Sequence, residues 1–190
     1  MKLHSKADVI YVIERDQWMM DILEAVKGLQ LPDDWICSGF VRAKIWDTLH
    51  GFRKRTPLPD LDVIYFDPVS IGESEEKKRE EQLRSMLPPI PWSVKNQARM
   101  HLVNGVPPYA SSVDAISKFP ETATAIGVKL RDDARVMLVA PCGVEDVLKG
   151  AVQPTPFFME TEERLAVYRE RVMKKDWAAT WKMLDIWDGY

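Results

Sequence analysis

Two stretches decide the expected fold: Trp35-Ile36-Cys37-Ser38-Gly39-Phe40-Val41-Arg42 and Asp60-Leu61-Asp62-Val63-Ile64-Tyr65-Phe66. The first opens with a short apolar run, which predicts a buried strand, and continues after Gly39 with apolar residues at helical spacing. The second is rich in β-branched and aromatic residues, which is typical of a strand. The first part of the chain is therefore predicted to form a strand, a glycine turn, a helix and a second strand, in that order.

Helices and strands are predicted to alternate through the rest of the sequence. Apolar spacing and turn residues indicate helices at 5–28, 40–49, 74–87, 96–103, 112–118, 121–126 and 144–149, strands at 35–38, 63–66 and 92–95, and a hairpin of 128–130 with 135–140. Helix 74–87 carries opposite charges four residues apart, which is typical of a solvated outer face. The pattern predicts a mixed α/β (α+β) fold, in which a small mixed sheet is flanked by helices.

A single domain is expected from the length of 190 residues, because domains usually contain about 100–200 residues. Its core should span about residues 5–150, and a helical tail should follow from about 157 to 190. The apolar content of 46% is ordinary for a globular chain, so a sizeable core is expected.

The charge balance excludes several classes of protein. Lys and Arg number 26 and Asp and Glu number 29, so the net charge is −3 and bulk DNA binding is not expected. No apolar run approaches the roughly 20 residues of a membrane span, and no secretory signal pattern opens the chain. We therefore expect no membrane partner and a cytoplasmic location. Two distant cysteines and three scattered histidines predict neither a disulfide framework nor a structural zinc site.

Ser38 and Gly39 lie where the first strand turns into a helix, and we call this pair the phosphate cradle. Glycine lets a ligand approach the backbone closely, and the free N–H groups of a helix start favour phosphate. A single glycine at such a turn is also compatible with turn formation alone.

Asp60 and Asp62 are two residues apart at the start of the second strand, so their side chains should share one face. Two carboxylates held in this way suit Mg²⁺, which prefers oxygen ligands. With 16 aspartates in the chain, one such pair is expected by chance, so the position beside the phosphate cradle carries the argument. The combination suits phosphoryl or nucleotidyl transfer.

Taken together, these motifs resemble the DNA polymerase β-like nucleotidyltransferase superfamily, and the implied fold is the polymerase β-like fold with a C-terminal helical tail. The run from Ser38 to Arg42 and the Asp-x-Asp strand are similar to those of tRNA nucleotidyltransferases. Most of the chain looks like a group of small bacterial proteins known as nucleotidyltransferase family proteins. The shared runs include Trp92-x-Val94-Lys95-Asn96-Gln97-Ala98-Arg99-Met100-His101 and Phe119-Pro120-Glu121-Thr122-Ala123-Thr124-Ala125.

The resemblance implies a role for each residue of the two motifs. Asp60 and Asp62 would be catalytic and would hold two Mg²⁺ ions, or Mn²⁺ in their place. Ser38 and Gly39 would contact the β- and γ-phosphates of a nucleoside triphosphate, and Arg42 would add positive charge. An acceptor hydroxyl, on a small molecule or an RNA, would attack the α-phosphorus and release pyrophosphate.

One departure concerns the third carboxylate that the superfamily usually carries on a following strand. The predicted strand 92–96 contains no acid. Asn96 is a candidate for a neutral ligand in that place, and the polar run Lys95, Asn96 and Gln97 is a candidate lining of the acceptor pocket. A catalytically inactive nucleotide-binding or regulatory module on the same fold therefore stays open, as does a metal-dependent phosphohydrolase.

The segment from Arg42 to Arg55 is locally basic. It contains five basic residues, Arg42, Lys44, Arg53, Lys54 and Arg55, and one acid, Asp47, which is an excess of +4. Because this segment joins the phosphate cradle to the aspartates, we expect a triphosphate to bind near it.

Overall fold

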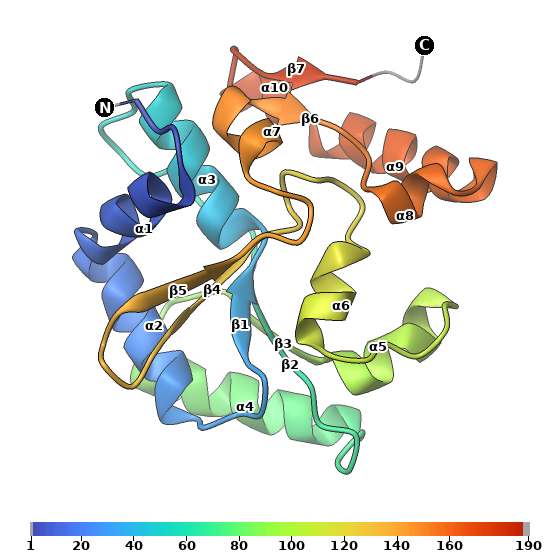
Figure 1. The fold of residues 1–190 in the computed structure, drawn as a ribbon. Helices are drawn as coiled ribbons and strands as arrows, with labels where there is room; N and C mark the ends of the chain where they lie inside the picture. Colours follow the sequence, from blue (N-terminus) through green and yellow to red (C-terminus); the bar gives the residue numbers. More distant parts are fainter. Residues whose placement is uncertain (1, 188–190) are drawn as a thin grey trace.

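The computed structural model describes residues 2–187, and their helices flank a central sheet (Figure 1). The helices are α1 Lys6–Glu14, α2 Gln17–Gly28, α3 Gly39–Leu49, α4 Glu73–Met86, α5 Gln97–Asn104, α6 Ser112–Ser117, α7 Glu145–Lys149, α8 Pro156–Met159, α9 Glu162–Lys175 and α10 Trp177–Thr180. The strands are β1 Trp35–Cys37, β2 Leu61–Tyr65, β3 Trp92–Asn96, β4 Gly127–Leu130, β5 Val136–Val139, β6 Ala151–Val152 and β7 Asp185–Ile186. The mixed α/β architecture predicted from the sequence is confirmed.

The main sheet has five strands in the order β3-β2-β1-β4-β5. Strand β1 is antiparallel to both β2 and β4, whereas β3 runs parallel to β2. Strand β2 therefore lies inside the sheet, and its side chains alternate between the two faces. Leu61 and Val63 enter the main core beneath α1, α2 and α3, and Ile64 joins a smaller cluster with Ile116 of α6 on the other face. Asp62 shares the face of Ile64.

The predicted helix at 5–28 is wrong, because the chain forms two helices there. Asp16 has an extended backbone and ends the first helical run, and its carboxylate accepts a hydrogen bond from the N–H of Met19 at the start of α2. The same carboxylate binds Lys44 and Arg55. A buried apolar stripe continues through both helices, which is why their spacing resembles one long helix.

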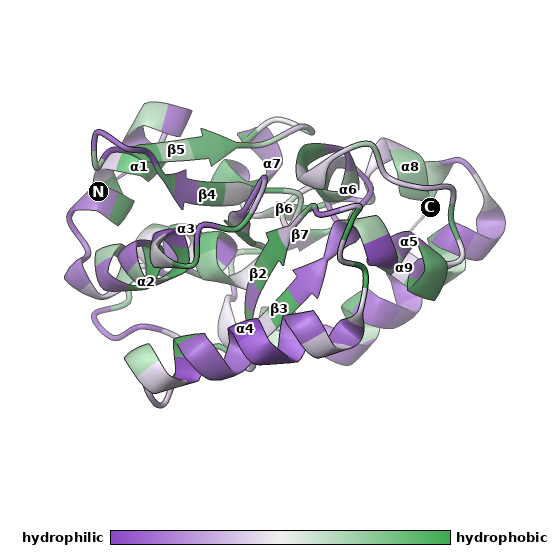
Figure 2. Ribbon diagram, turned by 90° about the horizontal axis from the view of Figure 1, so that it is seen from below, coloured by the Kyte–Doolittle hydropathy of each residue, from purple (hydrophilic) through white to green (hydrophobic). Residues whose placement is uncertain are grey.

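The predicted helix 74–87 forms as α4, and most of its side chains are exposed as predicted, but Glu76, Glu80 and Leu83 are buried. Figure 2 shows α4 as a mostly hydrophilic ribbon beside β3, which is an edge strand of the sheet. Glu76 is 0% exposed and its carboxylate accepts from the N–H of Asn96, while Glu80 accepts from the N–H of Val94. The two glutamates therefore satisfy the free backbone donors of the sheet edge, which in an open sheet would face water or another strand.

No helix forms at 121–126, contrary to the prediction. One turn closes between the Ala125 N–H and the Glu121 carbonyl, but the Thr124 hydroxyl also binds that carbonyl and competes with a helical ladder. The carbonyl of Ile126 instead accepts from the N–H of Ser38, so the chain passes directly into β4.

The predicted tail at 157–190 is mainly helical, through α8, α9 and α10, but it ends in a strand. Strand β7 pairs in parallel with β6, and the hydroxyl of Tyr168 donates to the Val152 carbonyl at 2.8 Å. Figure 1 shows the resulting cap of α9, α10 and β7 beside α7 and β6. Residues 188–190 of the predicted tail lie outside the described residues. None of the helices within residues 2–187 combines the length and apolar character that crossing a membrane requires.

Candidate active site

Five of the residues singled out from the sequence line one cavity of about 380 Å³, which we call the site cavity. They are Ser38, Gly39, Arg42, Asp60 and Asp62. The loop 56–59 forms a second side of the cavity. The C-terminal segment forms a third side, through Arg171, Lys175, Trp177, Thr180 and Trp181. The fold therefore brings the phosphate cradle, the arginine and the aspartate pair together, as the spacing predicted.

The aspartate pair lies at the start of β2, with Asp60 exposed and Asp62 half-buried. Burial raises the pKa of Asp62 to about 6, and the nearby charge of Asp60 acts in the same direction. The Ser93 side chain, Arg171 and Lys175 act in the opposite direction. The ionised form of Asp62 is therefore held at a cost in free energy, which a bound cation would relieve.

Ser93 stands beside Asp62 on the following strand, where the resemblance predicts a third carboxylate. The parallel register of β2 and β3 pairs Asp62 with Ser93, and side chains at one level of a parallel pair share a face. Across residues 2–187, no group of three or more His, Cys, Asp or Glu side chains is arranged to hold a metal ion. The donor set is thus two carboxylates, which fits Mg²⁺ when its other ligands are water and phosphate oxygens.

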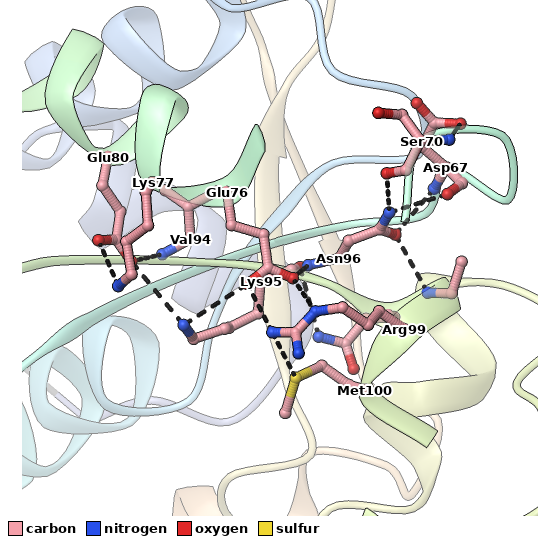
Figure 3. Close-up of polar contacts among 12 residues, drawn as sticks. Asp67, Ser70, Glu76, Lys77, Glu80, Val94, Lys95, Asn96, Arg99 and Met100 are labelled. Atoms are coloured by element: carbon pink, nitrogen blue, oxygen red, sulfur yellow. Dashed lines mark hydrogen bonds and ion pairs between the residues drawn. The ribbon is translucent and has the colours of Figure 1, made fainter. Parts of the chain in front are cut away.

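The structure does not bring Lys95, Asn96 and Gln97 to the site cavity. Asn96 pairs with Tyr65, three residues beyond Asp62 along the strands, roughly 10 Å at the usual rise of a strand. Figure 3 shows Lys95 and Asn96 among polar contacts with α4 and the turn after β2, and Lys95 lies 3.6 Å from Glu76. The expectation of a third ligand or an acceptor pocket at these residues is therefore corrected.

Asn96 has a structural role that uses its whole side-chain amide. Its Oδ1 accepts from the N–H groups of Asp67 and Ala98, at 3.0 and 3.1 Å, and so caps α5. Its Nδ2 donates to the carbonyls of Asp67 and Ser70, at 2.8 and 3.0 Å (Figure 3). An asparagine amide has two donors and two acceptor positions, and all four are occupied, so none is left for a metal.

Ser38 has a strained backbone at the phosphate cradle, with φ of +55° and ψ of −116°. This region is costly for any residue except glycine. The N–H of Ser38 donates to the Ile126 carbonyl at 3.0 Å, and its side chain makes no capping bond to α3. A Cβ on Gly39 would lie 3.7 Å from both Arg42 and Leu58, on the side of the cavity. The cradle thus keeps the start of α3 open to a ligand.

We expect Ser38→Gly to raise the free energy of unfolding by roughly 1 kcal/mol, because glycine adopts this backbone without strain. Urea denaturation measures the change. Ala134→Gly is the matched control, since Ala134 also has a positive φ, of +60°, outside the residues that line the site cavity. Both variants should gain stability, and only Ser38→Gly should alter ligand affinity. A loss of stability in Ser38→Gly would contradict the assignment of strain.

Arg42 is a buried cation, and among residues 2–187 its side chain has no hydrogen-bonded partner. Its side chain is 7% exposed, and within the described chain its Nε has no hydrogen-bond acceptor. The guanidinium carbon lies 5.1, 4.4 and 5.9 Å from the ring centroids of Trp46, Trp177 and Trp181. Burial lowers the pKa of Arg42 to about 10, so it stays charged at neutral pH. An unpaired buried charge is costly and is typical of a site that awaits an anion.

The site cavity holds both signs of charge without pairing them. Three cations, Arg42, Arg171 and Lys175, line it together with Asp60 and Asp62. Among residues 2–187, neither aspartate lies within 4.0 Å of any of these cations, and the ion pair of Arg171 is with Glu121 instead. A ligand that neutralises both groups must itself carry both signs, as a complex of a divalent cation with a polyphosphate does.

Only one of the five basic residues between 42 and 55 lines the site cavity. Lys44 and Arg55 both bind Asp16 at 2.8 Å, and Arg55 also stacks on Trp18, 3.8 Å from the ring centroid. Arg53 and Lys54 line a different, smaller pocket. The local excess of charge in the sequence therefore does not face the expected ligand.

Sequence reasoning missed Ser93 and the residues of the C-terminal segment. Arg171 and Lys175 stand four residues apart in an ordinary charged helix, so nothing in the local pattern separates them from solvated lysines and arginines. One feature of the sequence does indicate that this segment packs against the domain. Trp177 and Trp181 are four residues apart, and two tryptophans at this spacing predict a buried helix face.

The comparisons with known proteins concern the family and the fold of the chain. A family model described as nucleotidyltransferase matches residues 24–186. A protein whose NMR structure is described as revealing a CCA-adding enzyme head domain is 37% identical to the chain, with a TM-score of 0.87. That alignment covers 97% of this chain and 96% of the other. No curated protein matches the sequence.

More distant solved structures share the fold. The Thermotoga maritima CCA-adding enzyme complexed with tRNA is 12% identical, with a TM-score of 0.57, and the match covers 100% of this chain and 44% of that one. A CCA-adding enzyme in complex with CTP is 11% identical, with a TM-score of 0.59 and coverage of 97% and 43%. At these identities the likeness concerns the fold alone, and the chain spans less than half the length of these enzymes.

Proposed function

The chain belongs to the nucleotidyltransferase family, and from this premise we propose that it moves a nucleoside monophosphate from a nucleoside triphosphate to an acceptor hydroxyl, with release of pyrophosphate. The observation that carries the proposal is the site cavity, which two carboxylates and three cations line without pairing with one another among residues 2–187, although Arg171 pairs with Glu121. Solved structures of the same fold are complexes with ATP, CTP or tRNA, which supports a nucleoside triphosphate as donor. The acceptor would be a small molecule or an RNA.

The phosphates of the donor would bind at the cationic side of the cavity. The backbone of Ser38 and Gly39 presents the start of α3, and Arg42 presents a fixed guanidinium that is already desolvated. Because its stacking on the tryptophans fixes Arg42 before the ligand arrives, little reorganisation is needed as negative charge develops on the phosphates.

The carboxylate side of the cavity would hold the divalent cation. Asp60 and Asp62 are the residues that would bind Mg²⁺, or Mn²⁺ in its place, and the ion when bound supplies Lewis-acid polarisation of the phosphoryl oxygens. The two side chains would also orient the phosphate-bearing ligand, since they line the same cavity of about 380 Å³ as the three cations.

Isothermal titration with ATP, CTP, GTP and UTP, each with and without Mg²⁺, tests this function. We expect at least one nucleotide to bind only when the metal is present, and pyrophosphate to be released when a hydroxyl acceptor is added. The absence of metal-dependent binding for all four nucleotides would overturn the proposal. Release of phosphate in place of pyrophosphate would identify a phosphohydrolase instead.

A second candidate function is a catalytically inactive nucleotide-binding or regulatory module. Ser93 favours it, because this side chain stands beside Asp62 and cannot act as a base at neutral pH. Such a protein would bind the metal–nucleotide complex with the same residues and release no pyrophosphate with any acceptor.

We expect Ser93→Asp to raise the rate of pyrophosphate release at least tenfold, because an acid at this level of β3 adds an oxygen ligand and a base beside Asp62. Ser93→Ala is the control that removes the hydroxyl without adding an acid. A coupled pyrophosphate assay at saturating nucleotide compares the two variants. Equal rates in Ser93→Asp and Ser93→Ala would show that position 93 is not where an acid can act.

A further inference from the structure

The C-terminal segment forms a wall of the site cavity although it lies more than a hundred residues from the aspartates in sequence. Trp177 and Trp181 pack edge-on against Trp46 of α3, with ring centroids 5.7 and 5.1 Å apart. The Trp181 indole N–H donates to Asp47 at 2.8 Å, and β7 pairs with β6. These contacts hold the wall against the cavity in one position, so its charged side chains have a defined place.

Arg171 of α9 is fixed by a buried carboxylate. Its Nε donates to Oε1 of Glu121 at 2.6 Å, and Glu121 is 0% exposed. The second carboxylate oxygen of Glu121 accepts from the Thr124 hydroxyl at 2.7 Å, so the glutamate cannot swing away without losing both partners. Within residues 2–187 the two Nη atoms of Arg171 make no hydrogen bond, and the side chain keeps 34% of its surface exposed. The free end of the guanidinium is therefore available to a ligand in the cavity.

The loop that carries Glu121 also supports the phosphate cradle. The Ser38 hydroxyl lies 3.4 Å from the Thr124 carbonyl, and the Ser38 N–H donates to the Ile126 carbonyl at 3.0 Å. One short loop therefore contacts both the cradle and Arg171, and both line the same site cavity.

Lys175 follows Arg171 by four residues and so lies on the same face of α9. It lines the site cavity, and no carboxylate in the described part of the chain lies within ion-pair distance of it. Lys174, its neighbour, does not line this cavity. The helix thus presents Arg171 and Lys175, but not Lys174, to the ligand space.

Arg171 of the wall is near enough to Arg42 to affect the free energy of its charge. Burial is the main cause that lowers the pKa of Arg42, and among the nearby charges Glu121 raises that pKa and Arg171 lowers it. An anion with several negative charges that binds both Arg42 and Arg171 would offset the repulsion between them.

We propose that Arg171 and Lys175 bind the phosphates of the donor nucleotide together with the phosphate cradle, and that Glu121 is the positioning residue that holds Arg171. The inference rests on the proposed function and assigns the C-terminal segment to the same site. It predicts that the wall recognises the polyphosphate itself, so that inorganic pyrophosphate with Mg²⁺ is held by the same two side chains.

Titration calorimetry with Mg²⁺-pyrophosphate and Mg²⁺-ATP tests the assignment on the full chain. Arg171→Gln and Lys175→Gln should each weaken binding by about 5- to 50-fold, in the range expected for charge-assisted phosphate contacts. Lys174→Gln is the matched control, because it removes the same charge from the adjacent position, and its affinity should stay within about twofold of the native value. Arg171→Lys, which keeps the charge, should lose less than Arg171→Gln.

The role of Glu121 is tested by a double-mutant cycle. Glu121→Gln keeps an acceptor for Thr124 but loses the ion pair with Arg171, so affinity should fall in the native background and change little in Arg171→Gln. An equal loss in both backgrounds would show that Glu121 acts on the fold and not through Arg171.

The outcomes separate this inference from the function on which it rests. If the native protein binds Mg²⁺-ATP and the Arg171 and Lys175 variants behave like Lys174→Gln, the wall assignment is overturned and the proposed function stands. If the native protein binds neither Mg²⁺-ATP nor Mg²⁺ with any other nucleoside triphosphate, both are overturned.

Discussion

Replacing Asp60 and Asp62 together by asparagine should abolish Mg²⁺-dependent nucleotide binding, with a loss of affinity of at least about 100-fold. The physical reason is the donor set. Mg²⁺ takes oxygen ligands and favours carboxylates, and within residues 2–187 these two carboxylates are the acids that line the site cavity. Asparagine keeps the size of each side chain and removes the charge, so the loss would report on the metal and not on packing.

The same double variant should make the metal-free protein more stable at neutral pH. The pKa of Asp62 is about 6 in the folded protein against 3.8 for an ordinary aspartate, so the folded state holds the proton more tightly than the unfolded state. The native protein therefore loses stability as the pH rises from about 4 to 6, and the full cost, on the order of 1–3 kcal/mol, is present above pH 6. Asparagine does not ionise, so this pH dependence should disappear.

Urea denaturation between pH 4 and 8 measures the stability, and calorimetry measures the affinity. Asp67→Asn is the control, because Asp67 lies beyond the other end of β2 and outside the site cavity. Its Oδ1 accepts from the N–H groups of Val69 and Ser70, a role that an asparagine oxygen keeps. Unchanged metal-dependent binding in the double variant would rule out Asp60 and Asp62 as the metal ligands.

Arg42→Met should weaken nucleotide binding by about 100-fold and leave the protein at least as stable as the native one. The pKa of Arg42 falls from 12.5 to about 10 through burial, which means that its surroundings disfavour the charge by roughly 3 kcal/mol. Contacts with three tryptophan rings offset part of that cost. Methionine fills the same apolar space without a charge, so a gain on the order of 1 kcal/mol is expected.

Arg55→Met is the matched control for this prediction. Arg55 also stacks on a tryptophan, Trp18, but it is paired with Asp16 and lies outside the site cavity. Its removal should lower stability and leave nucleotide affinity unchanged. Thermal denaturation measures the stability of both variants, and calorimetry measures their nucleotide affinity. A destabilised Arg42→Met with native affinity would show that Arg42 is a structural residue.

The local elements were largely readable from the sequence because each depends on neighbouring residues. The apolar runs of β1, β2 and β3 and the spacing of α3 follow from the period of the side chains. The predictions that differ from the structure concern residues whose burial or position depends on a group far away in the sequence. Glu76 and Glu80 look like solvated charges, and they are buried because the edge of β3 offers them backbone donors.

The site residues also divide into those that the local sequence predicts and those that the tertiary structure decides. Ser38, Gly39, Arg42, Asp60 and Asp62 could be predicted to meet, because a strand, a tight turn, a helix and the adjacent strand leave little freedom in their relative positions. Asn96 was an attractive third ligand by residue type. The strand register places it beside Tyr65 and assigns Ser93 to the level of Asp62.

By itself, then, the sequence determined the α/β class, the phosphate cradle and the aspartate pair, since these depend on periodicity and on spacing within about 30 residues. Only the tertiary structure decided that the C-terminal segment closes the site cavity and that Arg171 and Lys175 face it. The reason is physical. The docking of that segment depends on packing between tryptophans far apart in the chain and on a buried carboxylate, and neither leaves a local pattern.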